Sequence, residues 1–255
     1  MRYFIELSYD GTAYHGWQIQ PNGNSVQETL QRALSLLLRT EVAVTGAGRT
    51  DAGVHAAMMV AHFDVEAPLP TPPIREEGAR QSAEDYLCYR LNGILPYDIA
   101  IHKIYPVADD MHARFSAIAR TYFYYVHTRK SPFLRDRSWR LVRTPDFEAM
   151  NRAAATLLEY EDFTSFSKVN TDTKTNICHV RSARWVQLSD YEWRFEITAD
   201  RFLRNMVRAI VGTLMEVGRG TLTLDGFRQV IDQKNRSEAG DSVPARGLFL
   251  QDIKY

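Results

Sequence analysis

The sequence has few cysteines, no long apolar run and no net charge. Its 255 residues include only Cys88 and Cys178, which form no CxxC pair, so neither a disulfide framework nor a zinc site is indicated. No apolar stretch approaches the roughly 18 residues that a membrane span needs. The first residues alternate like a strand and lack the apolar core of a signal peptide. We therefore expect a cytoplasmic globular protein without a metal.

The balanced total of charges hides a local asymmetry. The chain has 31 Lys and Arg against 31 Asp and Glu, which argues against a histone-like or tail-driven nucleic-acid binder. Residues 1–100 carry 7 basic against 12 acidic residues, whereas residues 101–143 carry 9 against 3. The second stretch suits a basic groove that attracts phosphates, and it equally suits a solvated loop that happens to be basic.

The first half of the chain predicts the element order β-α-β-β-α-β. Ser25 and Glu28 form a capping box, in which the serine hydroxyl and the glutamate carboxylate satisfy the first backbone amides of a helix. A second helix ends at Pro96. Alternating or apolar runs predict strands at residues 2–9, 42–45, 58–65 and 98–107, and the second helix spans residues 82–94.

The second half predicts the same order with one additional helix. Its first strand, residues 119–128, is rich in aromatic side chains, and a hairpin turns at Ser189 and Asp190. Thr144 and Pro145 are typical of a helix start, and Gly218 of a helix end. The expected helices span residues 144–159, 202–217 and a short stretch after Asp225, and the expected strands span residues 180–188, 193–198 and 247–254.

Two copies of the split βαβ order indicate a duplicated α+β fold. We expect ferredoxin-like halves, residues 1–107 and 108–255, that form one mixed, mainly antiparallel central sheet with helices packed on one side and a cleft on the other. The N-terminal half would carry the glycine-rich loop, and the C-terminal half the basic and aromatic elements. Residues 68–73 predict a loop and residues 75–81 a polar insertion, with no recognisable chemistry in either.

The glycine-rich segment of residues 45–56 is the most unusual part of the sequence. Three glycines within eight residues allow tight backbone and close approach of a ligand, but neither a Walker lysine nor a G-x-G-x-x-G pattern is present. Its chemical content is Asp51, two residues after Arg49. A neighbouring guanidinium keeps a carboxylate ionised, and an ionised aspartate can serve as nucleophile or base. The simpler interpretation, favoured by the pattern alone, is a tight turn capped by Asp51.

Two further patterns permit a functional and a structural interpretation. On the aromatic strand, Tyr122 and Tyr124 share one face and Phe123 and Tyr125 the other, which provides a platform for stacking a base or buries both faces. On the helix of residues 202–217, three arginines lie opposite the apolar stripe, where they could contact phosphates, reach a buried carboxylate or form a solvated face. These are Arg201, Arg204 and Arg208.

Seven segments, taken together and in order, resemble the tRNA pseudouridine synthase A family. The most specific is Gly-Arg-Thr-Asp-Ala-Gly-Val-His at residues 48–55. The others lie at residues 9–18, 25–28, 111–117, 162–166, 205–212 and 247–250.

The resemblance implies conversion of uridine to pseudouridine at positions 38, 39 and 40 of the tRNA anticodon stem-loop by a homodimer that uses no cofactor or metal. It implies that Asp51 is the catalytic aspartate and Tyr122 the tyrosine that packs on the target uracil. It further implies that Arg208 pairs with the aspartate and that Arg49 helps to flip the base.

Two alternatives from other classes stay open. The first is a non-catalytic RNA-binding or RNA-chaperone protein of two ferredoxin-like units, which would need the basic and aromatic surfaces but not Asp51. The second is an enzyme that uses Asp51 on a small nucleotide, although no Walker lysine, metal-ligand cluster or dinucleotide fingerprint supports it.

Overall fold

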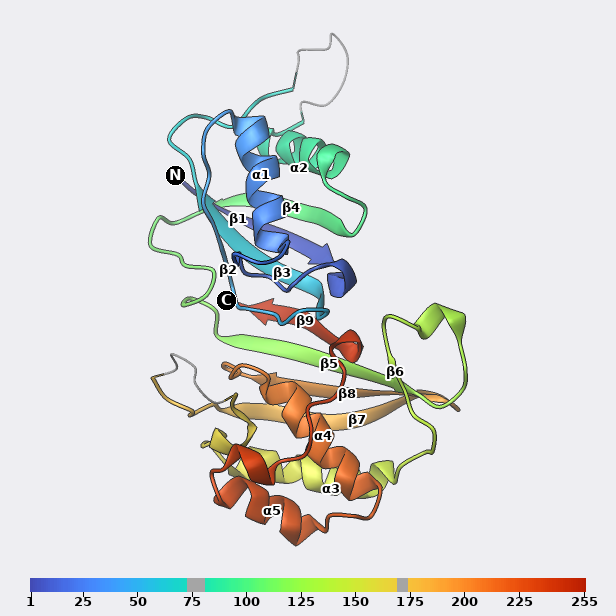
Figure 1. Ribbon diagram of the computed structural model, residues 1–255. Helices are drawn as coiled ribbons and strands as arrows, with labels where there is room; N and C mark the ends of the chain where they lie inside the picture. The colour runs from blue at the N-terminus through green and yellow to red at the C-terminus, as the bar shows by residue number, and fades with distance from the viewer. Residues whose placement is uncertain (73–80, 169–173) are drawn as a thin grey trace. The chain divides into compact units, whose positions relative to one another are not determined.

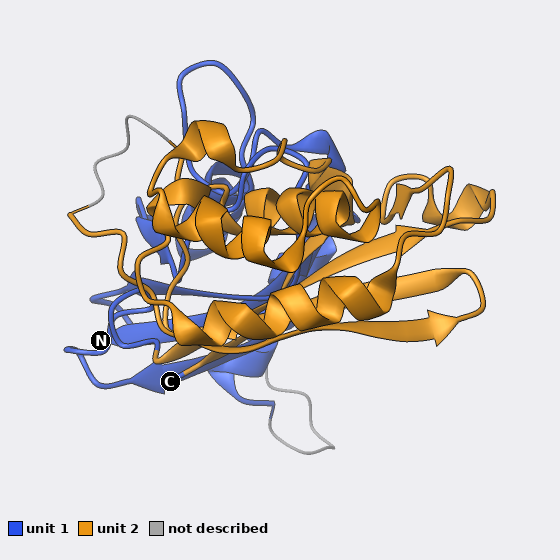
Figure 2. Ribbon diagram, turned by 90° about the horizontal axis from the view of Figure 1, so that it is seen from below, with its two compact units in different colours: residues 1–117, 255 blue, residues 118–254 orange. Residues whose placement is uncertain are grey.

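A computed structural model describes residues 1–72, 81–168 and 174–255. The chain divides into two compact units, Met1–Ala117 with Tyr255, and Ile118–Lys254, which are coloured separately in Figure 2. Most of the expected insertion at residues 75–81 lies outside the described residues. The division into functional halves at residue 107 stays a prediction.

Unit 1 consists of an antiparallel sheet with two helices (Figure 1). Its strands lie in the order β4-β1-β3, and β2 pairs with β3. The helices contact each other, and α2 packs against β4. The elements are β1 (Arg2–Tyr9), α1 (Val26–Leu38), β2 (Val44–Gly46), β3 (His55–Asp64), α2 (Ala83–Ile94) and β4 (Ile99–Val107).

Serine hydroxyls cap both helices of unit 1, and the first of these caps, at Ser25, confirms a prediction. The Ser25 hydroxyl accepts a hydrogen bond from the Glu28 amide at 3.2 Å, and the Ser82 hydroxyl accepts one from the Asp85 amide at 3.0 Å. Each bond satisfies an amide that the helix itself leaves without a partner. Apolar side chains of α1, α2 and the sheet form the buried core, among them Phe4, Leu7, Leu30, Leu34, Met59 and Leu87.

A buried histidine joins the sheet of unit 1 to the segment that follows β4. His62 on β3 is 6% exposed, and its Nδ1 accepts a hydrogen bond from the Ala113 amide at 3.1 Å. The His112 ring lies edge-on, 4.6 Å away between ring centroids. Burial, with the positive charge of Arg2 and the neighbouring His112 as smaller causes, lowers the pKa of His62 to about 4.

This pKa predicts a loss of stability in acid. The unfolded chain protonates His62 near pH 6.5, whereas the folded chain binds that proton only near pH 4. The uncharged, buried His62 therefore contributes fully to the free energy of unfolding above pH 6.5, and this contribution is lost as the pH falls toward 4. We expect the free energy of unfolding of the wild type to fall in this window by about 1–3 kcal/mol more than that of His62→Gln. Urea denaturation at several pH values measures the difference.

His179→Gln is the matched control for this measurement. The His179 side chain is 56% exposed and lies beside Glu161. We expect this variant to keep the wild-type pH dependence. Equal pH dependence in His62→Gln and the wild type would contradict a buried, unprotonated His62.

Unit 2 repeats the element order of unit 1 with additions. Its sheet has the strand order β9-β5-β8-β7, all neighbours antiparallel, and β6 pairs in parallel with the end of β5. The helices α3, α4 and α5 lie on one face of this sheet (Figure 1). The elements are β5 (Ala119–His127), β6 (Trp139–Arg140), α3 (Phe147–Thr156), β7 (Val180–Ser189), β8 (Glu192–Ala199), α4 (Met206–Gly218), α5 (Leu224–Asp232) and β9 (Leu248–Lys254). The α+β class and the duplicated β-α-β-β-α-β order are confirmed.

Two predicted helix starts in unit 2 are wrong. The first residue of α3 is Phe147 and its cap is Asp146, whose carboxylate accepts a hydrogen bond from the Ala149 amide at 2.8 Å. The helix α4 begins only at Met206, because Asn205 has a left-handed backbone with φ of 67°. Arg201 and Arg204 therefore precede the helix, and the predicted basic helix face with Arg208 does not exist.

No helix in the part of the chain that the structure describes is long and apolar enough to cross a membrane.

Candidate active site

The turn that carries Asp51 lies between β2 and β3 of unit 1. The Ala47 amide donates to the Val60 carbonyl at 2.8 Å where the chain leaves β2. The Val54 amide donates to the Asp51 carbonyl at 3.1 Å, and Gly53 has φ of 73°. Asp51 is therefore part of a tight turn, as predicted, and the bond that closes the turn is accepted by the main-chain carbonyl of Asp51. The predicted cap by the Asp51 side chain stays a prediction.

The segment after β1 holds the Asp51 turn through backbone contacts. The Trp17 amide donates to the Thr50 carbonyl at 3.2 Å, and the Gly53 amide donates to the Tyr14 carbonyl at 3.3 Å. The Tyr9 and Thr50 hydroxyls form a buried hydrogen bond of 2.8 Å. Three bonds from residues 9–17 thus position the residues on both sides of Asp51.

Glycine is required where the two segments meet. Gly16 has φ of 95°, and a Cβ at this position would overlap the Thr50 carbonyl oxygen. A Cβ at Gly11 would likewise overlap the Val54 carbonyl oxygen. Such overlap with backbone atoms is relieved only by moving the turn itself. The resemblance contained these glycines at residues 9–18, but spacing alone gave no sign of this contact.

Polar side chains hold the segment after β1. His55 is 1% exposed, and its Nδ1 accepts a hydrogen bond from the Gly11 amide at 3.2 Å and lies 3.1 Å from an Asp10 carboxylate oxygen. The Tyr14 hydroxyl donates to Asp98 at 2.7 Å. Burial, aided by Asp98, raises the pKa of Tyr14 and keeps the hydroxyl protonated as a donor. These buried contacts fix the segment that in turn fixes the Asp51 turn.

Arg49 shares the turn with Asp51, and its side chain is exposed. The exposed guanidinium is available to a nucleic-acid phosphate or to a displaced base. Thr50, between them, is 7% exposed, so the two charged residues are separated by an anchored one.

Tyr122 lies on β5 of unit 2, on the face predicted for it together with Tyr124. Its ring meets Phe202 edge-on, with 5.1 Å between centroids and an interplanar angle of 84°. Tyr124 is fully buried, and its hydroxyl donates to the Pro244 carbonyl at 2.9 Å. The two tyrosines of this face thus differ. Tyr124 belongs to the core, whereas Tyr122 is only half-buried and is fixed by an aromatic neighbour.

Arg208 lies in the first turn of α4 and is braced by the segment before β9. Its Nε donates to the Val243 carbonyl at 2.7 Å, and the Val243 amide donates to the Arg208 carbonyl at 3.3 Å. The neighbouring Asn205 donates to the Ser242 hydroxyl at 2.5 Å. The Nε bond orients the plane of the guanidinium, and with it the two terminal nitrogens. Neither Ser242 nor Val243 was identified from the sequence, because both contribute through the backbone or a short hydroxyl.

Each unit carries two of the four predicted site residues. Arg49 and Asp51 belong to one turn of unit 1, and Tyr122 and Arg208 lie on β5 and α4 of unit 2. Within the described residues, no group of three or more His, Cys, Asp or Glu side chains could hold a metal ion. The available chemistry is that of one carboxylate, two guanidiniums and an aromatic ring.

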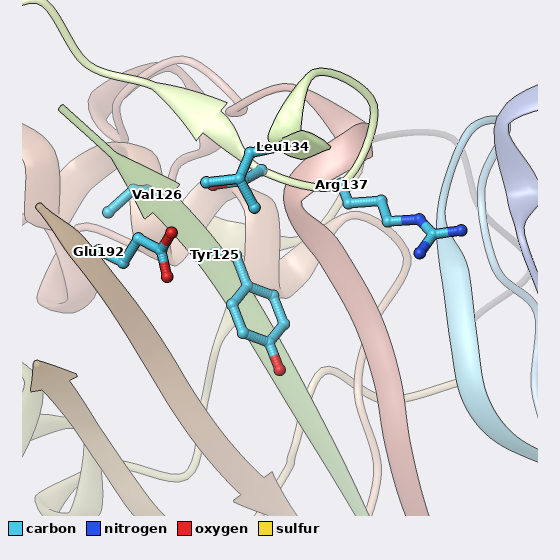
Figure 3. A pocket seen from close by; sticks show the side chains of 6 residues that line it. Tyr125, Val126, Leu134, Arg137 and Glu192 are labelled. Carbon is cyan, nitrogen blue, oxygen red and sulfur yellow. The ribbon is translucent and has the colours of Figure 1, made fainter. Parts of the chain in front are cut away.

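A small cavity lies beside β5 (Figure 3). Its volume of about 30 Å³ suffices for one water molecule and is far too small for a nucleobase. The lining residues are Tyr125, Val126, Leu134, Arg137, Ser138 and Glu192. This cavity is therefore not a substrate site.

Comparison with known proteins decides the family. The profile of the family described as tRNA pseudouridine synthase matches residues 7–116 and 153–255. The tRNA pseudouridine synthase A of Bacteroides thetaiotaomicron is 57% identical over 256 residues, covering 100% of this chain and 90% of the relative. This chain belongs to the tRNA pseudouridine synthase family.

Two further members of the family are similar to this chain over nearly its full length. The tRNA pseudouridine synthase A of Bacteroides fragilis is 56% identical over 255 residues, covering 100% of this chain and 96% of the relative. That of Acetivibrio thermocellus is 39% identical over 251 residues, covering 98% of this chain and 97% of the relative. The synthase profile includes Asp51 and Arg208, whereas residues 117–152, with Tyr122 on β5, lie between its two matched segments.

Proposed function

We propose that this chain isomerises uridine to pseudouridine at positions 38, 39 and 40 of the tRNA anticodon stem-loop. The observation that carries the proposal is Asp51, a carboxylate on a turn whose backbone is fixed from both sides and which lies in the most family-specific segment of the sequence. Membership of the family and the names of the relatives support the reaction and the tRNA substrate. The three positions come from the resemblance to the tRNA pseudouridine synthase A family.

Asp51 is the catalytic residue of this proposal. The reaction breaks the N1–C1′ bond, turns the uracil and joins C5 to C1′, and the proton leaves C5 while N1 gains one. An ionised aspartate can attack C1′, add to C6 of uracil or take the C2′ proton. All three routes start from the same requirement, a carboxylate held at the reacting nucleotide. The anchored turn supports this role, because it fixes the backbone on both sides of Asp51.

The other three residues bind the substrate. Tyr122, whose ring Phe202 fixes, stacks on the target uracil. Arg208, whose guanidinium the Val243 carbonyl orients, pairs with an anionic group. Arg49 occupies the space that the flipped nucleotide leaves, which offsets part of the few kcal/mol that flipping costs.

The proposal includes a homodimer that acts in the cytoplasm. The resemblance implies a dimer with the tRNA crossing both subunits, and tRNA is a substrate of that compartment. Sedimentation equilibrium measures the state of association, and a monomer at enzyme-assay concentrations would contradict the dimer.

The deciding experiment maps pseudouridine in tRNA. We expect incubation of an unmodified tRNA that carries uridine at positions 38–40 with the wild type to give carbodiimide-dependent reverse-transcription stops at those positions. Stops at other uridines would contradict the assigned positions. Tight binding without any stops would favour the RNA-binding alternative.

A further inference from the structure

The finger of residues 128–138, which connects β5 to β6, presents one aromatic side chain to solvent. Phe133 lies in a short 3-10 turn, Pro132–Leu134, and is 89% exposed. The next residue, Leu134, points inward and lines the small cavity with Tyr125 and Val126 (Figure 3). The turn therefore places the half-buried Leu134 against the cavity and leaves its neighbour Phe133 exposed.

The base of the finger is fixed by hydrogen bonds. The buried His127 Nδ1 and Ser138 Oγ are 2.8 Å apart, and the Leu141 amide donates to the His127 carbonyl at 2.7 Å. The Thr128 amide donates to the Tyr191 carbonyl at 3.0 Å. A loop anchored at both ends loses little conformational entropy when it binds a ligand. Phe133 is thus presented by a preorganised support.

The segment that carries Phe133 is rich in basic residues. The finger and the residues up to 143 contain six basic residues and a single acidic one, Asp136. The Arg129 guanidinium lies over the Tyr191 ring at 4.7 Å, and the pair of Arg135 with Asp136 is exposed and contributes little to stability. The six basic residues are Arg129, Lys130, Arg135, Arg137, Arg140 and Arg143.

Isolated exposed apolar residues are ordinary on protein surfaces, so exposure alone assigns no role to Phe133. Tyr97 in unit 1 is fully exposed as well, but Asp98 follows it and the first 100 residues have an excess of acidic groups. Phe133 combines exposure, an anchored support and a basic neighbourhood. Aromatic rings for stacking among cationic groups for phosphates are the common means of binding unpaired nucleotides.

We propose that Phe133 stacks on an unpaired base of the tRNA, while the basic residues of the finger hold the adjoining phosphates. The assignment rests on the proposed function only for its substrate, tRNA, and not for the role of Asp51. The finger lies within residues 117–152, outside the segments that the family profile matches.

The test measures binding of unmodified tRNA at several salt concentrations. We expect Phe133→Ala to raise the Kd about tenfold without changing its salt dependence, because stacking releases no counterions. Phe133→Trp should bind like the wild type. Lys130→Ala should weaken binding and reduce the slope of log Kd against log salt by about 0.7, the value for one phosphate contact. Tyr97→Ala is the matched exposed aromatic, and we expect it to change nothing.

A second experiment identifies the contact as stacking. Abasic nucleotides are placed one at a time in the single-stranded parts of the tRNA. At one position, the Kd of the abasic tRNA for the wild type should equal that of intact tRNA for Phe133→Ala. Combining the abasic tRNA with Phe133→Ala should raise the Kd no further. Wild-type affinity in Phe133→Ala, or additive losses at every position, would overturn the proposal.

The outcome is separable from that of the proposed function. Because Phe133 is exposed, Phe133→Ala should melt at the wild-type temperature, so a lost contact is not confused with misfolding. If the wild type bound tRNA without forming pseudouridine, the proposed function would fail and the Phe133 result would still stand. If pseudouridine formed and Phe133→Ala bound normally, only the stacking contact would fail.

Discussion

Asp51→Asn is expected to abolish pseudouridine formation while leaving the Kd for tRNA within about twofold of the wild type. The amide has the size of the carboxylate but carries no charge and is neither nucleophile nor base. The turn's own bond uses the Asp51 backbone carbonyl, which the substitution keeps. We expect the single-turnover rate to fall by at least about 10⁴-fold, as for other residues that act directly on the reacting atoms.

Asp110→Asn provides the matched control for Asp51→Asn. It removes an exposed carboxylate of the same unit, after β4, and should leave the rate and the Kd unchanged. Rate is measured with enzyme in excess over tRNA, and binding by filter retention of labelled tRNA. A variant at position 51 that keeps measurable turnover, or that loses binding as strongly as rate, would show that Asp51 is not the catalytic residue.

The elements of the fold were predictable because their signals are local. The Ser25–Glu28 pattern predicted a helix cap, and in the structure the Ser25 hydroxyl accepts a hydrogen bond from the Glu28 amide three residues later. The alternation of residues 2–9 and the aromatic-rich run of residues 119–128 predicted strands that end within one residue of the observed ones. Such signals act over a few residues of sequence, so the local structure that they predict depends little on the rest of the chain.

The predictions failed where long-range contacts override the local pattern. Apolar periodicity predicted that the helix α4 begins at residue 202. The left-handed Asn205, which is hydrogen-bonded to Ser242, delays its start to Met206. The two-residue strand β6 has no alternation to detect and exists because it pairs with the end of β5. One failure was local instead: Thr144 and Pro145 resembled a helix start, whereas Asp146, the next residue, forms the cap.

The site was predictable in part for the same reason. Arg49 and Asp51 are close in sequence, and their turn was expected from its glycines. The support of that turn by Tyr9, Tyr14 and Trp17 joins residues more than 30 positions apart and has no sequence period. The roles of Tyr122 and Arg208 came from the family resemblance and stay predictions, to which the structure adds their supports, Phe202 and Val243.

Gly16→Ala should damage catalysis through the backbone contact that holds the Asp51 turn. An alanine would have to adopt φ of 95°, and its Cβ would overlap the Thr50 carbonyl oxygen, one residue before Asp51. We expect the free energy of unfolding to fall by about 1–3 kcal/mol, because strain and overlap are relieved by shifting the turn. A displacement near 1 Å at a catalytic group costs about 10²-fold in rate. The single-turnover rate should fall by that order, and the Kd for tRNA should change much less.

Gly48→Ala separates this effect from a general intolerance of the turn. Gly48 lies three residues before Asp51, its φ lies outside the left-handed region that favours glycine, and a Cβ added there would have no atom within 4 Å. Its rate and stability should stay near those of the wild type. Rates are compared well below each variant's melting temperature, where both are fully folded, so that lost stability alone cannot lower the rate per molecule. A wild-type rate in Gly16→Ala under these conditions would mean that the Thr50 carbonyl moves without Asp51. The contact between Gly16 and the Asp51 turn would then contribute to stability alone.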